Sequence, residues 1–353
     1  MILAGHTADA ITRAAQTIRA GGLVGLPTET VYGLAADADN PLAVAQIFSA
    51  KGRPSDHPLI VHVANATVVS RFARDVPPFA QRLIDAFWPG PVTLILPRRA
   101  EMAAAAAGGQ HSIGLRCPAH PVAQALLQTL LAPNAGDTKA VYGLAAPSAN
   151  QFGRVSPTTA HHVQAEMGES LLILDGGACA VGIESTIVDC SRGKPVLLRP
   201  GSLTVAQLSA ACGQRVWLQE ELAAEDLQAP RASGTLESHY APSAKVRLMD
   251  ARALQAALDL LGAELDAKSD GVNNGRIDSK PHIATWSRVI LRSKSARILR
   301  RRMPDDAAAT AHQLFSVLRE FDAQGVKLIW VETPPGVPEW DGVRDRLTRA
   351  AAA

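Results

Sequence analysis

The chain has 353 residues, which is long enough for a sizeable core and two domains. Hydrophobic residues make up 47% and charged residues 19% of it, as in ordinary globular proteins, so disorder is excluded as the default state. The 35 basic and 33 acidic side chains nearly balance, which argues against a protein that coats a polyanion, although a local basic face stays open.

Strand-like and helix-like segments alternate over the first 213 residues. A helix is predicted over residues 8–22, and a second helix has Asn40 as its cap, Pro41 in its first turn and Gly52 at its end. Short β-rich runs and two further helical stretches follow: the runs are LVGL (23–26), LIVHV (59–63), VTLIL (92–96), IGLR (113–116), LLILD (171–175), STIVD (185–189) and PVLL (195–198), and the helices cover 77–87 and 157–168. This mixture predicts a layered sheet with helices packed on it.

The pattern breaks at a polar stretch, residues 219–244, which carries Pro and Gly but no sustained apolar period. Beyond it, strands are predicted at KVRLM (245–249), ATWSRVIL (284–291) and VKLIWVE (326–332), with helices over 251–265, near 305–323 and at the chain end. We therefore predict a domain over residues 1–213, a linker or lid over 214–244 and a small α/β domain over 245–353. The last contains no G-x-G-x-x-G, so its pattern indicates no nucleotide site.

The hexapeptide VYGLAA occurs twice, at residues 31–36 and 141–146. A repeat architecture would extend the similarity over a period of ~20–50 residues, and the flanks here do not match. We interpret the pair as a coincidence or as two similar strand ends.

Cysteine spacing and the N-terminus favour the cytoplasm. Cys117, Cys179, Cys190 and Cys212 show no C-x-x-C spacing, which argues against a disulfide framework or a zinc site. The first 20 residues lack the basic region and apolar core of a signal peptide, and no run of about 18 apolar residues predicts a membrane span.

The stretch KGRPSDHPLIVHV, residues 51–63, concentrates ionisable side chains where a strand begins. Lys51 and Arg53 can simply complement the negative end of the preceding helix. His62 lies inside the strand, where its imidazole must be hydrogen-bonded or face a cleft. Because ligand sites of open α/β sheets gather at strand ends, a functional role is equally open.

Hydroxyls, amides and cations recur at other strand ends: in PTETVYGLAAD (27–37), HSIGLRCP (111–118), APSANQFGRVSPTT (146–159), GIESTIVD (182–189) and LLRPGS (197–202). Such a set suits a polyanionic ligand bound with a small polar one, because Arg and Lys hold phosphates while hydroxyls and amides fix orientation. The sequence has no Walker loop, no Ser-His-Asp signature and no metal-ligand spacing. These residues alone indicate an ATP-using transferase.

Eight motifs together resemble the threonylcarbamoyl-AMP synthase family in its longer form: PTETVYGL, AKGRPSDHPLIVHV, FWPGPVTLIL, APSAN, SPTTA, ESTIVD, LRPGS and HYAP. The similarity is dense over residues 10–205, and in the C-terminal part it depends on LFSVLREFD and VRDRLTRAA. It implies a twisted mixed α/β sheet flanked by helices, followed by a linker and a small Rossmann-like domain. It also implies an enzyme that joins L-threonine, bicarbonate and ATP into threonylcarbamoyl-adenylate and releases pyrophosphate. A downstream threonylcarbamoyltransferase would then modify the tRNA adenosine beside the anticodon.

The resemblance also implies a site. The catalytic residues would be Lys51 and Arg53, from the family's Lys-x-Arg signature; ATP would be bound by Lys51, Arg53, His57, Ser112, Ser148, Asn150, Ser156, Arg199 and Tyr240; and threonine would be bound by Thr30, His62, Arg116, Ala146 and Ser185. Arg116 would pair with the threonine carboxylate. Magnesium would be held mainly by the phosphates, without a protein metal site.

Two positions depart from the family pattern. His57 stands where the family usually has asparagine, and because histidine titrates near neutral pH, ATP affinity should vary with pH. ASGTLES (232–238) replaces a Pro-Gly-Met-like stretch before HYAP. By the resemblance this linker folds over the N-terminal site and brings Tyr240 near the nucleotide. The alternative is a spacer in which Tyr240 packs on the second domain.

Plainer interpretations stay open beside these. Thr30 and Ser185 can satisfy turns, Asn150 can be a loop residue, and Arg116 can be an ion-pair partner. As a function, a non-catalytic RNA-binding module would use the basic run RSKSARILRRR (292–302), which is more typical of a solvated face; direct tRNA binding is left open. A carbamoyltransferase of related fold would carry cysteine clusters, which this sequence lacks.

Overall fold

The computed structural model describes residues 1–132, 139–222, 230–232, 234, 239–267, 281–293, 295 and 297–353, with the backbone alone for 262–267. The chain forms two compact units. Unit 1 comprises Met1–Phe152 and Ser156–Thr235, and unit 2 comprises Gly153–Val155 and Leu236–Ala353. The division between them falls inside the predicted linker.

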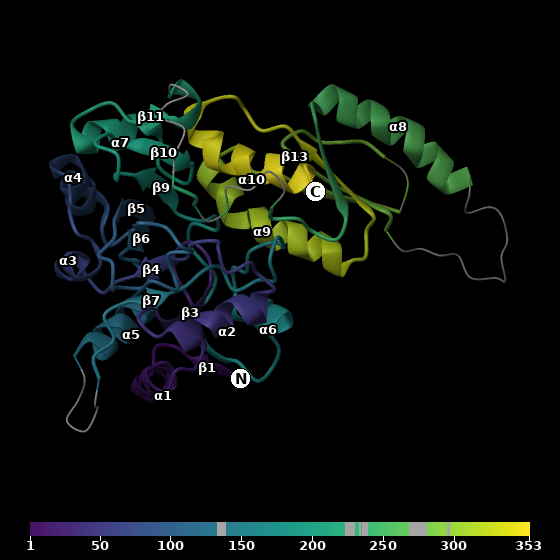
Figure 1. Cartoon of the computed structure of the whole chain (residues 1–353). Helices are drawn as coiled ribbons and strands as arrows, with labels where there is room; N and C mark the ends of the chain where they lie inside the picture. Colours follow the sequence, from purple (N-terminus) through teal and green to yellow (C-terminus); the bar gives the residue numbers. More distant parts are fainter. Residues whose placement is uncertain are drawn as a thin grey trace. The chain divides into compact units, whose positions relative to one another are not determined.

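Unit 1 is built on one large mixed sheet (Figure 1). Its described strands are β1 (Ile2–Ala4), β2 (Val24–Leu26), β3 (Gly33–Asp37), β4 (Ile60–His62), β5 (Val92–Pro97), β6 (Ser112–Arg116), β7 (Leu144–Ala145), β8 (Leu172–Asp175), β9 (Thr186–Asp189), β10 (Val196–Arg199) and β11 (Trp217–Leu218). Their order is β1-β8-β2-β3-β7-β4-β6-β5-β9-β10-β11. Parallel pairs such as β4–β6 and β5–β9 alternate with antiparallel pairs such as β5–β6, so the predicted mixed sheet is confirmed.

Helices cover both faces of this sheet but not along its whole length. On one face, α1 (Ala8–Arg19) and α5 (Pro121–Leu131) share a hydrophobic cluster with side chains of β2, β3, β7 and β8. On the other face, a larger cluster joins the sheet to α2 (Pro41–Lys51), α3 (Val69–Phe72), α4 (Pro78–Phe87), α6 (Ala160–Met167) and α7 (Val205–Cys212). Short 3-10 turns lie at Ala66–Val68 (η1) and Gln219–Glu221 (η2).

The face that α1 and α5 cover continues across β4, β6, β5, β9 and β10, and we call that continuation the site face. Paired residues of neighbouring strands point to the same side of a sheet. His62 pairs with Arg116, Thr93 with Ile187, and Ile187 with Arg199. The apolar cluster on this part of the face is formed by strand and loop residues, and it includes residues of the predicted linker. In the part of unit 1 that the structure describes, polar side chains of this face are thus buried among strand and loop residues.

Local signals in the sequence act as expected at α2. The Asn40 side chain accepts hydrogen bonds from the amides of Leu42 and Ala43, and Gly52 ends the helix with a φ of +59°. The two VYGLAA copies form neighbouring antiparallel strands, since Ala36 of β3 pairs with Ala145 of β7. The interpretation as two similar strand ends is therefore confirmed.

Unit 2 is a smaller α/β structure. Its sheet has the order β12-β15-β13-β14, with every pair parallel: β12 (Lys245–Met249), β15 (Leu328–Glu332), β13 (Ile283–Ser287) and β14 (Ile298–Arg302). α8 (Ala251–Ala267) packs on one face. α9 (Ala307–Ala323) and α10 (Asp341–Ala351) pack on each other, and the 3-10 turn η4 (Pro338–Trp340) lies between β15 and α10. The predicted small α/β domain is confirmed, but the sequence missed β14, which occupies part of the basic run.

No helix among the described residues combines the length and hydropathy that crossing a bilayer requires.

Candidate functional site

The end of α2 and the loop after β7 form one corner of the site, which we call the carbonyl corner. The Lys51 ammonium is buried and donates to the backbone carbonyls of Ser148, at 2.6 Å, and of Asn150. In return, the Phe152 amide donates to the Lys51 carbonyl at 2.9 Å. Burial, together with the nearby Arg53 cation, lowers the pKa of Lys51 to about 7. The carbonyls fix the ammonium in place without neutralising it.

Arg53 and His57 extend this corner. Arg53 Nη2 donates to the Pro58 carbonyl at 3.1 Å, and its guanidinium lies 5.6 Å from the centre of the Phe152 ring. His57 meets the same ring edge-on at 5.4 Å. Partial burial and the Arg53 charge lower the pKa of His57 below its usual value. The predicted ATP residues Lys51, Arg53 and His57 are therefore neighbours.

The loop that carries Ser148, Asn150 and Ser156 docks on the segment after β2. The Ala149 amide donates to the Tyr32 carbonyl at 2.9 Å, and Ser148 forms an isolated bridge with Gly33. Asn150 is buried, and the Ser156 hydroxyl donates to the carboxylate of Glu184. The structure thus brings three predicted ATP residues onto one loop beside Lys51.

A second corner, the carboxylate corner, is centred on Arg116. Its Nη2 lies 2.6 Å from Oε1 of Glu29, its Nη1 donates to the Thr30 hydroxyl at 2.7 Å, and its Nε donates to the Gly90 carbonyl at 3.2 Å. Both charged side chains are almost fully buried, with exposed fractions of 4% for Arg116 and 11% for Glu29. The ion-pair interpretation of Arg116 is confirmed, and it places Arg116 directly against Thr30.

His62 borders Arg116 across β4 and β6. Burial is the main cause that lowers the pKa of His62 to about 3, with a second contribution from the Arg116 charge. The imidazole is therefore neutral at physiological pH. Ala146 lies beside it, because its amide donates to the carbonyl of Ile60 in the same strand at 3.0 Å. These two predicted threonine residues thus belong to the carboxylate corner.

Ser185 and Arg199 form a third group on the site face. Arg199 Nη2 donates to the Ser185 carbonyl at 2.9 Å and to its hydroxyl at 3.2 Å, and Arg199 Nε donates to the same carbonyl at 3.1 Å. The Ser185 hydroxyl also contacts Thr93 Oγ1 at 2.8 Å. Arg199 was predicted with the ATP residues and Ser185 with the threonine residues, and the structure joins the two.

Ser112 lines a small cavity on the site face together with Ile60, Thr93 and Arg231. Arg231 comes from the predicted linker and forms an ion pair with Asp56 at 2.6 Å. The backbone amide of Arg231 donates to Oε1 of Gln110 at 2.7 Å. Described residues of the linker therefore lie against unit 1, next to Asp56 and His57.

Tyr240, by contrast, is part of unit 2. It is buried, its ring centre lies 5.5 Å from that of Phe315, and the Arg346 guanidinium lies 5.2 Å from the ring centre. Its φ of +62° is unusual for a residue other than glycine. Tyr240 thus has the packing described by the spacer alternative, and its predicted role at the nucleotide stays a prediction.

Sequence reasoning assigned no role to several residues of this site, among them Glu29, Thr93 and Arg231. Glu29 had a usable signal, because it is a carboxylate between two threonines directly after a buried strand. Thr93 and Arg231 had none, since a threonine in a strand and an arginine in a polar linker are ordinary residues.

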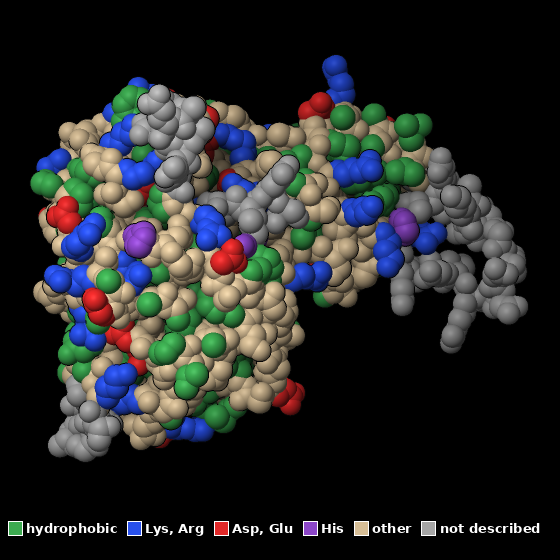
Figure 2. All heavy atoms as spheres, in the orientation of Figure 1, with side chains coloured by type: hydrophobic (Ala, Val, Ile, Leu, Met, Phe, Trp, Pro, Cys, Tyr) green, Lys and Arg blue, Asp and Glu red, His purple; other side chains and the backbone are tan. Residues whose placement is uncertain are grey.

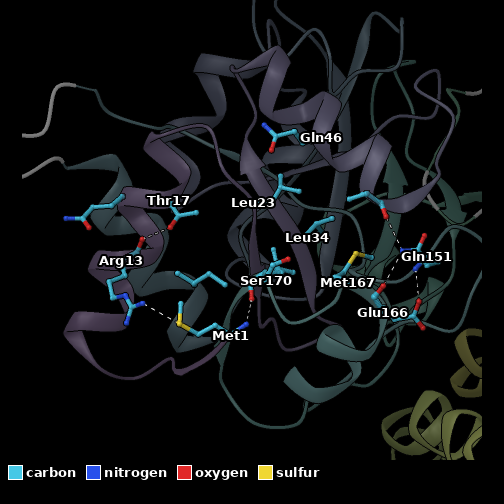
Figure 3. A pocket seen from close by; sticks show the side chains of 14 residues that line it. Met1, Arg13, Thr17, Leu23, Leu34, Gln46, Gln151, Glu166, Met167 and Ser170 are labelled. Atoms are coloured by element: carbon cyan, nitrogen blue, oxygen red, sulfur yellow. Dashed lines mark hydrogen bonds between the residues drawn. The ribbon is translucent and has the colours of Figure 1, made fainter.

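A separate groove of about 700 Å³ lies between α1, α2 and α6 (Figure 3). Arg13, Gln46, Gln151 and Glu166 line it, and none of the predicted site residues does. The backbone amide of Gln151 donates to the Glu166 carboxylate there at 2.9 Å. In the described part of the chain, no group of three or more His, Cys, Asp or Glu residues could hold a metal ion.

Two family models match the chain. The Sua5/YciO/YrdC model, described as "Telomere recombination", matches residues 16–201, and the model for the C-terminal domain of threonylcarbamoyl-AMP synthase matches residues 203–352.

Relatives and solved structures agree with these matches. Threonylcarbamoyl-AMP synthase of Pyrococcus abyssi is 35% identical over 96% of this chain and 93% of its own length. The Bacillus subtilis enzyme of the same name is 34% identical over 97% and 92%. The crystal structure of P. abyssi Sua5 complexed with L-threonine aligns with a TM-score of 0.80 at 32% identity, covering 97% of this chain and 94% of that one.

Proposed function

Because the chain belongs to the threonylcarbamoyl-AMP synthase family, we propose that it joins L-threonine, bicarbonate and ATP into threonylcarbamoyl-adenylate and releases pyrophosphate. The observation that carries the proposal is the pair of corners in unit 1, one with buried cations held by carbonyls and one with a buried ion pair. The product would supply a threonylcarbamoyltransferase that modifies tRNA. The cytoplasmic location stays a prediction.

The carbonyl corner suits the triphosphate. Lys51 donates to neutral carbonyls, Arg53 donates to the Pro58 carbonyl, and phosphates are bound by such cations. Because burial and the Arg53 charge lower the pKa of Lys51 to about 7, bound phosphates would favour its charged form. Ser148, Asn150 and Ser156 on the adjoining loop would orient the nucleotide. The carbonyls of Ser148 and Asn150 already accept from Lys51, and the Glu184 carboxylate accepts from the Ser156 hydroxyl. We therefore propose that magnesium arrives with ATP and is held mainly by its phosphates.

The carboxylate corner suits threonine. The P. abyssi relative binds L-threonine. In this chain Arg116 would bind the threonine carboxylate, with Thr30, neutral His62, Ala146 and Ser185 around the amino acid. A neutral imidazole can bind substrate without adding charge to a pocket that already contains one ion pair.

The reaction needs positioning more than covalent help. The threonine amine and bicarbonate form a carbamate and water, and a carbamate oxygen then attacks the α-phosphorus while pyrophosphate leaves. Holding the two reactants in line and stabilising the phosphate charge can supply most of the rate enhancement. Lys51 and Arg53 of the carbonyl corner would stabilise that phosphate charge.

The linker is the proposed lid. Support comes from Arg231, which contacts Asp56 and Gln110 of unit 1. A solved P. abyssi Sua5 structure carries alanine at a histidine and a tyrosine, and this chain has an adjacent His239–Tyr240 pair near the end of the predicted linker. A lid that closes over the reactants would exclude water.

One assay tests the proposal. The full chain is incubated with ATP, bicarbonate and threonine, and pyrophosphate and the threonylcarbamoyl-adenylate mass are measured. Product should require all three substrates, and pyrophosphate release that is equal with ATP alone would refute the proposal.

The RNA-binding alternative gains no support. Within the predicted basic run, Arg301 pairs with Glu320, and Arg302 lies 3.0 Å from Asp305. On the face shown in Figure 2, Lys and Arg side chains are spread out with Asp and Glu among them. This mixed pattern is typical of a solvated surface.

A further inference from the structure

We propose that Glu29 binds the α-amine of L-threonine, so that Glu29 and Arg116 recognise the two charges of the amino acid as a pair. The inference rests on the proposed function and concerns a residue that the family resemblance did not assign.

Three buried polar atoms in the carboxylate corner have no hydrogen-bond partner within the described residues: Oε1 of Glu29, Nη2 of Arg116 and Nδ1 of His62. The first two lie 2.6 Å apart, so they attract each other electrostatically, but they are not aligned as a donor and an acceptor. Buried polar atoms without hydrogen bonds are rare and often belong to ligand sites. Oε1 of Glu29 is an acceptor, and Nη2 of Arg116 is a donor.

Neighbouring contacts hold both groups in place. Oε2 of Glu29 accepts from the Ala119 amide at 3.0 Å, and its backbone carbonyl accepts from the Val181 amide at 2.7 Å. Arg116 is anchored by Thr30 and Gly90. Since neither side chain can turn freely, Oε1 and Nη2 stay fixed side by side.

An α-amino acid complements this arrangement. Its ammonium donates to a carboxylate oxygen, and its carboxylate accepts from a guanidinium. Glu29 and Arg116 together carry no net charge, and neither does the zwitterion, so binding leaves no buried charge without a counter-charge. His62 is neutral and does not disturb this balance.

A purely structural role for Glu29 makes a different prediction. If Glu29 only holds Arg116, its loss weakens every ligand whose carboxylate binds Arg116. If Glu29 binds the amine, its loss weakens only ligands that have the amine.

The experiment uses calorimetric binding to the full chain with two ligands: L-threonine and 2,3-dihydroxybutanoate of matching stereochemistry, in which a hydroxyl replaces the amine. Glu29→Gln should weaken L-threonine binding about ten- to a hundred-fold, because a charge-assisted hydrogen bond is lost. Binding of the hydroxy acid should stay within about two-fold. Asp189→Asn is the matched control, because Asp189 is buried and pairs with Arg192 at 2.6 Å, outside the predicted site. It should change neither affinity.

Equal losses for the two ligands, or no loss for L-threonine, would overturn the inference. Parent protein that binds no L-threonine would instead refute the proposed function. If thermal melting shows that Glu29→Gln is unfolded, Glu29→Asp, which keeps the charge and shortens the side chain, replaces it. That variant should weaken L-threonine binding selectively, and equal losses for both ligands would again overturn the inference.

Discussion

Lys51 and Arg116 are both buried cations of unit 1, yet their partners differ. Lys51 donates to neutral carbonyls of Ser148 and Asn150, whereas Arg116 lies against the carboxylate of Glu29. The Lys51 ammonium is therefore met by carbonyl dipoles, whereas the Arg116 charge is compensated by a carboxylate. Unit 1 thus buries one cation among carbonyls and another against a carboxylate, and we propose that the first corner binds the triphosphate and the second the amino acid.

The difference also concerns stability. Removing a buried cation that is paired with a carboxylate leaves the carboxylate charged and without a counter-charge in the low-dielectric interior, which is costly. A cation held by carbonyls leaves only neutral acceptors behind, each of which costs less. Removing the cation of the carboxylate corner should therefore lower the free energy of unfolding more than removing the cation of the carbonyl corner.

The largest expected effect is in the carboxylate corner. Arg116→Met should lower the free energy of unfolding by about 3–5 kcal/mol, because it leaves Glu29 buried without its counter-charge. Glu29→Met combined with Arg116→Met should recover most of that stability while L-threonine binding stays lost. Urea unfolding measures these free energies, and an Arg116→Met variant as stable as the parent would contradict the expected cost of an unpaired Glu29.

Lys51→Met should chiefly affect catalysis. Removing this cation should slow product formation by about 10²–10³-fold and weaken ATP binding, because a preorganised charge for the phosphates is lost. L-threonine affinity should be retained. Calorimetry with each ligand separates the two, and matched losses for ATP and threonine would show that the corners are not distinct.

His62 sharpens the comparison through pH. Its pKa of about 3 lies below the usual histidine value, so between those limits the unfolded chain binds a proton that the folded chain does not. Stability should fall as pH drops below about 6.5, by up to about 1.4 kcal/mol per pH unit from this group. In His62→Gln that part of the acid sensitivity should vanish. Urea titrations between about pH 4 and 7 measure the slope, and an unchanged slope would contradict the assignment.

A smaller effect is expected at His57. Its lowered pKa makes it cationic only below the usual histidine range, where Lys51 remains protonated. ATP affinity should therefore rise on the acid side, and His57→Asn should flatten that rise. A profile that His57→Asn does not alter would show that this side chain is not at the nucleotide.

The smallest effect is expected in the linker. The ion pair of Arg231 with Asp56 is more than half exposed on both sides, so Arg231→Ala should change stability by about 0–1 kcal/mol. If the linker is a lid, the variant should nevertheless lose the protection from proteolysis that ATP and threonine give. Lys245→Ala, an exposed cation of β12, serves as the control. Equal cleavage of the parent with and without ligands would argue against a lid.

Local patterns and dense motifs made much of this protein predictable from sequence. Caps and apolar spacing placed α2, because Asn40 and Gly52 act within a few residues of themselves. The motifs placed the family and the mixed sheet, and the roles of the site residues stay predictions. β14 was missed because its residues, Ile298–Arg302, read as a basic run rather than as alternating apolar and polar positions.

The sequence by itself determined which residue types the protein brings to its strand ends: cations, hydroxyls and amides. Only the tertiary structure decided their partners. Glu29 and Arg116 are 87 positions apart in the sequence, and Lys51 donates to carbonyls nearly a hundred residues away. No local pattern could therefore show that one cation lies against a carboxylate and the other against carbonyls. Charge compensation in a buried site depends on distance and burial, and both are set by the packing of the sheet.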